Sequence, residues 1–101
     1  MIGIVIEHRA KDKEESKKLI GVIDLVHAAE RKQPGSISSE TMIDVTDLCH
    51  VVVMSSWKTL EDLNAWERSE VLRSFTPLLE KHLNGQRTTV KMTENVVWKY
   101  S

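Results

Sequence analysis

The part of the sequence that decides the fold runs from Leu48 to Trp66 and reads LCHVVVMSSWKTLEDLNAW. Residues 48–57 are typical of a β-strand, and the run Val51–Met54 makes both faces of that strand apolar. Thr59 predicts the start of a helix, because a threonine hydroxyl accepts a hydrogen bond from a free amide of the first turn. The helix carries an apolar stripe at helical spacing, formed by Leu60, Leu63 and Trp66.

Towards the N-terminus, isoleucine alternates with other residues at positions 2, 4 and 6, which predicts a first strand. Asp12 and Glu15 have the spacing of a capping box, in which each side chain satisfies a free amide at a helix start. Apolar residues then recur at helical spacing over residues 13–32. Pro34-Gly35 ends this predicted helix, because proline cannot continue it and glycine supplies the turn.

The rest of the chain follows the same rules. A polar strand is predicted over residues 36–45, and a last strand over residues 88–99. Ser69 predicts the cap of a second helical piece after Trp66. Pro77 is expected at the first position of a further turn capped by Thr76, because a proline inside a helix costs about 3 kcal/mol.

The predicted order is β-α-β-β-α-β, which is the split β-α-β order of a ferredoxin-like α+β fold with an antiparallel sheet in one domain over residues 1–101. This order places the first and third strands at the centre of the sheet. The helices of such a fold cover one face of the sheet, yet the third strand is apolar on both. A second copy of the chain is the simplest cover for the open face, so we expect a homodimer.

Composition excludes several classes of function. The chain has 101 residues and a net charge of −1, so no basic excess points to a nucleic-acid partner. No stretch approaches the roughly 20 apolar residues of a membrane span. Cys49 is the one cysteine, which rules out an internal disulfide. The N-terminus shows no secretion signal, so we expect a cytoplasmic protein without a membrane partner.

Motifs for metal or nucleotide chemistry are also missing from the sequence. The four histidines, at positions 8, 27, 50 and 82, do not pair with other ligands in a familiar metal-binding pattern, so we predict no metal site. No glycine-rich phosphate loop and no nucleophile elbow occur. We therefore expect neither nucleotide-dependent nor hydrolytic chemistry.

Residues 51–69, VVVMSSWKTLEDLNAWERS, resemble the signature of antibiotic-biosynthesis-monooxygenase domains. In that family a strand ends in tryptophan, a capped turn follows, and a helix carries a second tryptophan nine residues later, before a serine. Residues 34–40, PGSISSE, resemble the start of the family's second strand. The resemblance implies a dimeric α+β barrel with a cavity between helices and sheet in each subunit.

The resemblance also implies a choice of chemistry. Some members of the family oxygenate anthrone-type or quinol aromatics with molecular oxygen, without metal or flavin, and others degrade haem. The haem-degrading members use an asparagine, a tryptophan and a histidine, and the matching positions here are His8, Trp66 and Thr76. Because threonine cannot replace the histidine that binds the iron, haem degradation is disfavoured, although haem binding is left open. We expect no cofactor.

Four residues are candidates for the site. His8 continues the face of the first-strand isoleucines and is a candidate base, the alternative being a strand-end histidine bonded to backbone or water. Trp66 is a candidate wall for a planar substrate, or else part of the core. Trp57 and His50 are further candidates for substrate binding, with core packing favoured for Trp57. The face that His50 takes is not settled by the pattern.

Two functions from different classes remain. The first is a cofactor-independent monooxygenase that acts on a small quinol-like or anthrone-like aromatic, with His8 as base and Trp66 orienting the substrate. The second is a non-catalytic barrel that binds a small aromatic ligand in the same cavity. A haem-binding protein is a weaker third hypothesis.

Overall fold

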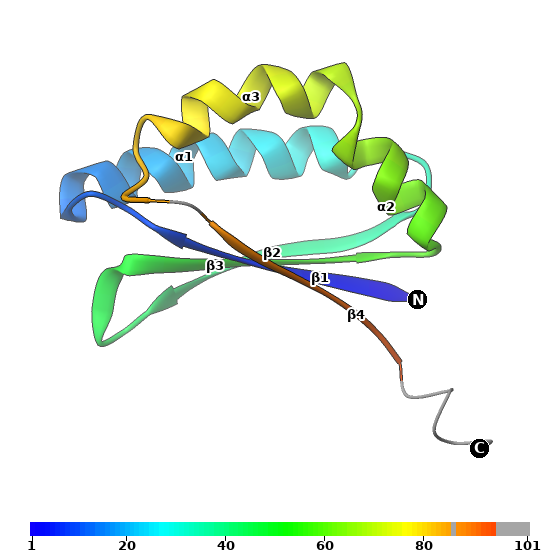
Figure 1. Cartoon of the computed structure of the whole chain (residues 1–101), viewed down its shortest axis with the longest axis horizontal. Helices are drawn as coiled ribbons and strands as arrows, with labels where there is room; N and C mark the ends of the chain where they lie inside the picture. The colour runs from blue at the N-terminus through cyan, green and yellow to red at the C-terminus, as the bar shows by residue number, and fades with distance from the viewer. Residues whose placement is uncertain (86, 95–101) are drawn as a thin grey trace.

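The computed structural model describes residues 1–85 and 87–94, and they form a four-stranded antiparallel sheet with three helices on one face (Figure 1). The elements in chain order are β1 (Ile2–Arg9), α1 (Lys13–Glu30), β2 (Ser36–Asp44), β3 (Asp47–Trp57), α2 (Leu60–Glu67), α3 (Glu70–Glu80) and β4 (Thr88–Thr93). The strands are arranged in the order β2-β3-β1-β4. The predicted ferredoxin-like α+β fold is confirmed, with β1 and β3 at the centre of the sheet.

The three predicted capping residues accept the expected hydrogen bonds, but the second half of the predicted capping box does not form, because the Glu15 carboxylate pairs with Lys18 and His82. Asp12 Oδ1 accepts a hydrogen bond from Glu15 N at 2.8 Å, and Thr59 Oγ1 accepts one from Asp62 N at 3.1 Å. Ser69 Oγ accepts one from Leu72 N at 3.2 Å. Each oxygen satisfies an amide that has no partner within its own helix, which fixes where α1, α2 and α3 begin.

Gly35 is required where the chain turns from α1 into β2. Its φ is +83°, and a Cβ atom at this position would lie 2.1 Å from Asp62 Oδ2. Glycine alone allows both the left-handed backbone and this close approach of α2. The turn thereby holds the N-terminus of α2 next to the end of α1.

The prediction for Pro77 is wrong, because Pro77 lies inside α3 and does not begin a new turn. Proline has no N–H for the carbonyl four residues earlier, so α3 lacks one internal hydrogen bond there. Thr76 does not cap a helix; its hydroxyl donates to the Leu72 carbonyl at 3.2 Å. The packing of α3 beside α1, which buries Leu79 in the core, outweighs the local cost of the proline.

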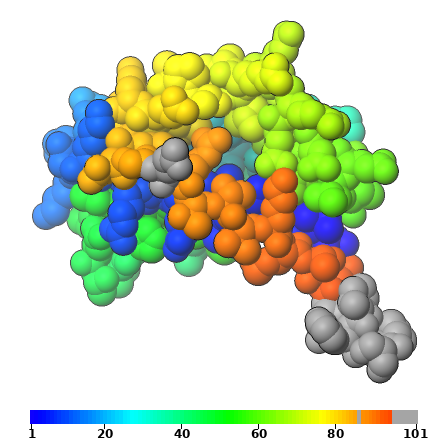
Figure 2. Space-filling view, viewed as in Figure 1, coloured from blue at the N-terminus to red at the C-terminus, as the bar shows by residue number. Residues whose placement is uncertain are grey.

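The predicted last strand is described only in part. β4 begins at Thr88 as expected and pairs with β1, Val5 lying opposite Val90. Residues 95–99 of the predicted strand, which include Val96 and Trp98, lie outside the described residues. In the space-filling view, α3 (yellow) and β4 (orange) form adjoining parts of the surface (Figure 2).

The core fills the space between the helices and the sheet in two clusters. One cluster surrounds Val51 and includes Leu19, Ile23 and Leu79. The other surrounds Trp57 and includes Ile4, Leu63 and Trp66. Among the described residues, no helix combines the length and the apolar composition needed to cross a membrane.

Candidate functional site

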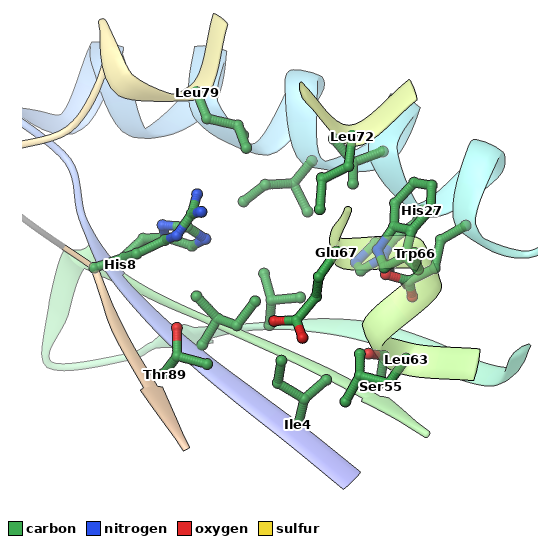
Figure 3. Close-up of a pocket in the computed structure, with 16 residues that line it drawn as sticks. Ile4, His8, His27, Ser55, Leu63, Trp66, Glu67, Leu72, Leu79 and Thr89 are labelled. Atoms are coloured by element: carbon green, nitrogen blue, oxygen red, sulfur yellow. Dashed lines mark ion pairs between the residues drawn. The ribbon is translucent and has the colours of Figure 1, made fainter. Parts of the chain in front are cut away.

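A cavity of about 90 Å³ lies between the helices and the sheet, where the two core clusters meet (Figure 3). Its walls are mainly aliphatic. His8 and His27 stand towards opposite ends, and Glu67 lies between them. The lining comes from β1, β3 and β4 below and from all three helices above. The lining residues that bear on the chemistry are His8, His27, Glu30, Trp66, Glu67 and Arg87.

His8 marks one end of the cavity. It lies on β1 in line with Ile4 and Ile6, and it is buried, with 3% of its surface exposed. Its Nδ1 atom has no hydrogen-bond partner among the described residues. Burial first, and then the positive charge of Arg87, lower the pKa of His8 from 6.5 to about 4. The imidazole is therefore neutral at pH 7.

Glu30 and His27 mark the other end, one turn apart on α1. His27 Nδ1 lies 4.0 Å from Glu30 Oε1, and neither atom has a hydrogen-bond partner among the described residues. The other imidazole nitrogen, His27 Nε2, is hydrogen-bonded to Thr41 Oγ1 at 2.8 Å, which holds the ring in place. Figure 3 shows His27 beside Trp66, across the apolar walls from His8.

The environment shifts both of these groups towards their neutral forms. Burial raises the pKa of Glu30 from 4.5 to about 7, while the Arg31 charge and the Trp66 side chain oppose that rise. Burial and the Arg31 charge lower the pKa of His27, against a smaller opposing effect of Asp24. The Glu30 carboxyl therefore titrates near neutral pH.

Unpartnered polar atoms gather at this cavity. Among the described residues, four buried side-chain atoms lack a hydrogen-bond partner, and three of them belong to cavity-lining residues: His8 Nδ1, His27 Nδ1 and Glu30 Oε1. A buried polar group without a partner costs about 1–3 kcal/mol, and native proteins keep few of them. The cavity thus combines aliphatic walls with three buried polar atoms that have no hydrogen-bond partner among the described residues.

Trp66 forms part of the cavity wall, and Trp57 supports it from behind. The two indoles stack with their ring centroids 6.3 Å apart. Trp57 is fully buried, and its Nε1–H donates to Ser55 Oγ at 3.2 Å, so its polar edge is occupied. Trp57 does not line the cavity, so its predicted role in substrate binding is at most indirect.

His50 does not share the cavity, contrary to its selection as a substrate-binding residue. Side chains alternate between the two faces of a strand, and in β3 the cavity-facing positions are Val53 and Ser55, so His50 points to the opposite face. There His50 Nδ1 lies 3.1 Å from Asp44 Oδ2, and Nε2 lies 3.2 Å from Glu7 Oε1. Of the four predicted site residues, the structure brings His8 and Trp66 to one cavity.

The sequence reasoning missed Glu30 and underrated His27. Glu30 stands four residues after Val26 and seven after Ile23, so it falls on the apolar stripe of α1. A carboxylate on a stripe that faces the core is a signal, because acidic residues are seldom fully buried without a partner. Arg87 was missed because no pattern in the loop before β4 indicates its direction.

Comparison with known proteins agrees with this architecture. A sequence profile described as "Antibiotic biosynthesis monooxygenase" matches residues 1–77. The chain therefore belongs to the antibiotic biosynthesis monooxygenase family. A search of the curated proteins gives no match.

Solved structures with the same fold cover almost the whole chain. A conserved protein from Methanosarcina mazei Go1 superimposes with a TM-score of 0.86 at 16% identity, covering 93% of this chain and 92% of its own. A putative antibiotic biosynthesis monooxygenase from Nitrosomonas europaea gives 0.85 at 14% identity, covering 94% and 99%. A variant of SnoaB, a cofactor-independent oxygenase from Streptomyces nogalater, gives 0.84 at 11% identity, covering 93% and 92%. At these identities the likeness establishes the fold alone.

The residues present do not fit haem. The position that matches the iron-binding histidine of haem-degrading relatives is Thr76, whose hydroxyl is engaged with the Leu72 carbonyl. The cavity of about 90 Å³ is also far smaller than the roughly 300–1,000 Å³ of ordinary small-molecule sites. A porphyrin would need the helices to separate from the sheet.

Proposed function

We propose that this protein is an oxygenase that uses molecular oxygen, without metal or flavin, to oxidise a small quinol-like aromatic in the cavity. The observation that carries the proposal is the set of unpartnered polar atoms at the two ends of an apolar cavity with an indole wall. The family to which the chain belongs and a cofactor-independent oxygenase of the same fold support the reaction class.

The size of the cavity favours a single aromatic ring. A cavity of about 150 Å³ in another protein binds benzene, so about 90 Å³ approaches one ring if the side chains adjust slightly. A three-ring anthrone would require a much larger opening. We therefore narrow the expected substrate from quinol-like or anthrone-like aromatics to quinols with one ring.

The proposed reaction needs only a base, an oriented ring and exclusion of water. Deprotonation of a hydroxyl leaves its electron pair on the ring oxygen, and the electron-rich ring passes one electron to O₂. The radical and superoxide combine to form a C–O bond, and the resulting hydroperoxide loses water. One quinol and one O₂ thus give one hydroxyquinone and one water.

We assign His8 the role of a proton acceptor for a substrate hydroxyl, and Trp66 that of an orienting wall. The neutral imidazole of His8 has a lone pair available at pH 7, because burial and the Arg87 charge keep its pKa near 4. The Trp66 indole offers a flat apolar surface for a ring.

Oxygen uptake with methylhydroquinone tests the proposal. The protein should consume O₂ faster than the protein-free solution at pH 7, and labelled ¹⁸O₂ should place one ¹⁸O atom in the quinone product. His8→Ala should lower the rate by about 100-fold or more. If the wild-type rate equals the protein-free rate with both methylhydroquinone and hydroquinone, the proposal that the protein is a quinol oxygenase is rejected.

A non-catalytic binding protein is the second candidate, and the low pKa of His8 favours it. A group with a pKa of about 4 is a weak base towards a phenol, whose pKa is about 10. This candidate predicts saturable binding of methylhydroquinone and a raised melting temperature, without oxygen uptake.

We also propose that the protein is a homodimer that pairs through the open face of the sheet. The face carries apolar side chains from all four strands, with Met42, Val90 and Met92 each about half exposed: 54%, 49% and 50%. On the same face, β1 contributes Val5 and β3 contributes Met54, which lie opposite each other. An exposed apolar face of this kind marks an interaction site.

A cytoplasmic location completes the proposal. Cys49 is the one cysteine of the chain and is free, so folding does not depend on an oxidising compartment.

A further inference from the structure

The cavity has a second polar end, formed by Glu30 and His27, that the proposed role of His8 does not use. We propose that Glu30, positioned beside His27, binds the substrate hydroxyl furthest from His8 and is the first proton acceptor of the reaction. This inference rests on the proposed function and specifies its substrate class as single aromatic rings with oxygen atoms at both ends.

The geometry places this carboxylate where a ligand oxygen is needed. Glu30 is 5% exposed, and it lines the cavity from the last turn of α1. Glu30 Oε1 and His27 Nδ1 are 4.0 Å apart, too far for a hydrogen bond to each other, and both lack partners among the described residues. With a small movement of the two side chains, a hydroxyl oxygen that enters between them would donate its proton to Glu30 and remain in contact with His27.

The apolar walls explain why the ligand should carry two oxygens. Figure 3 shows His8 at one end and His27 and Trp66 at the other, with aliphatic side chains such as Ile4 and Leu72, and the Glu67 side chain, between them. A ring with one hydroxyl can satisfy only one end. A para-quinol brings one oxygen to each end and lays its apolar ring against the walls.

The acid–base properties favour Glu30 over His8 as the first acceptor. Proton transfer is most effective when the pKa of the base lies near the working pH. Burial raises the pKa of Glu30 to about 7, whereas burial and Arg87 hold that of His8 near 4. Glu30 is thus ionised in part at pH 7 and is the stronger base of the two.

The remaining charged groups around the cavity are consistent with Glu30 as the first proton acceptor. From α2, Glu67 lines the cavity, but its Oε1 accepts a hydrogen bond from Lys91 Nζ of β4 at 2.6 Å. Arg31 follows Glu30 on α1 and favours the ionised carboxylate. Arg87 stands with His8, and its positive charge would stabilise an anionic ring.

The proton balance of a quinol needs two acceptors. In the first step the O–H bond at the Glu30 end breaks, its electron pair stays on the ring oxygen, and the proton moves to Glu30 Oε1. The hydroxyl at the other end donates a hydrogen bond to His8 and loses its proton to His8 as the quinone carbonyl forms. As the O–O bond of the hydroperoxide breaks, the C–H bond at the same carbon also breaks, and its electron pair forms a C=O bond. That proton becomes the hydroxyl proton of the hydroxyquinone after tautomerisation. Both acceptors return their protons to the oxygen that leaves as water.

The experiment compares Glu30→Gln with Glu14→Gln. Glutamine keeps the shape of the side chain and removes the base, and Glu14 is an exposed residue of α1 whose loss should leave turnover unchanged. With methylhydroquinone, Glu30→Gln should lower kcat by about 100-fold or more and leave KM little changed. The wild-type kcat should rise with an inflection near pH 7, and that inflection should be absent in Glu30→Gln.

Binding measured without oxygen tests the need for two ligand oxygens separately from the role of Glu30 as a proton acceptor. Hydroquinone should bind wild type more tightly than 4-methylphenol, in which a methyl group replaces one hydroxyl, and Glu30→Gln should weaken the preference. Turnover by Glu30→Gln with the wild-type kcat and pH profile would overturn the role of Glu30 while leaving the oxygenase standing. Binding without oxygen uptake in wild type would reject both the oxygenase and Glu30 as an acceptor. Equal binding of the two phenols would reject the two-ended site.

Discussion

Trp57 and Trp66 stack with their ring centroids 6.3 Å apart and 26° between their planes. Trp57 ends the central strand β3, and Trp66 stands near the end of α2, so the stack joins the sheet to the helix that lines the cavity. The Nε1–H of Trp57 is engaged with Ser55 Oγ, which fixes its ring. The position of the Trp66 wall therefore depends on a residue that does not itself line the cavity.

The stack should be measurable as an energetic coupling. Trp57→Leu and Trp66→Leu should each destabilise the protein, and the double variant should lose about 0.5–1.5 kcal/mol less than the sum of the two. Urea unfolding of the four proteins gives the coupling. Additive losses within about 0.3 kcal/mol would mean that the rings share a core without supporting each other.

The sequence predicts the fold well because each element carries its own local signal. The caps at Asp12, Thr59 and Ser69, and the turn at Gly35, all lie where the pattern places them. Pro77 is the exception, since a local rule against proline in a helix is outweighed by tertiary packing that the sequence does not reveal.

The site is less predictable than the fold because it depends on the face of each strand or helix from which a side chain points. His8 follows from the alternation of β1, since residues on one face share one interior. The same rule cannot place His50, because β3 is apolar on both faces and its sequence does not indicate which face points to the cavity. Glu30 stands out only when a carboxylate on an apolar stripe is treated as a functional signal rather than a helix end.

His8 should affect activity and stability in opposite directions. His8→Phe keeps a flat ring and removes the buried Nδ1 atom that has no partner among the described residues. Because such an atom costs about 1–3 kcal/mol, the free energy of unfolding at pH 7 should stay the same or rise. Oxygen uptake with methylhydroquinone should fall by about 100-fold. A variant that keeps its activity would show that His8 is only a core residue.

The open face of the sheet should control assembly. Met54 lies in the middle of that face on β3, opposite Val5 of β1, and Met54→Lys places a charge where the partner would pack. Sedimentation equilibrium should give a dimer for wild type and a monomer for Met54→Lys. Val45→Lys is the control, since Val45 is 92% exposed in the turn after β2 and should leave the dimer intact. A monomeric wild type would refute the proposed interface.

Glu30 and His8 should give stability a pH dependence with two opposite parts. The pKa of Glu30 is about 7 in the folded protein against its ordinary 4.5. The part of the free energy of unfolding that depends on Glu30 is therefore fully present below pH 4.5 and is lost as the pH rises to 7. The pKa of His8 is lower in the folded protein, about 4 against 6.5, so its contribution is present above pH 6.5 and is lost as the pH falls to 4.

Single variants should separate these two parts. In Glu30→Gln the loss between pH 4.5 and 7 disappears, so relative to wild type this variant should gain up to about 3 kcal/mol at pH 8 and much less at pH 4. In His8→Phe the acid-side loss shrinks, because His8 no longer has to gain a proton in a buried site. Urea unfolding at pH 4, 6 and 8 measures both differences. A gain in Glu30→Gln that is the same at all three pH values would show that burial does not perturb this carboxyl, and the case for Glu30 as a base near neutral pH would fall with it.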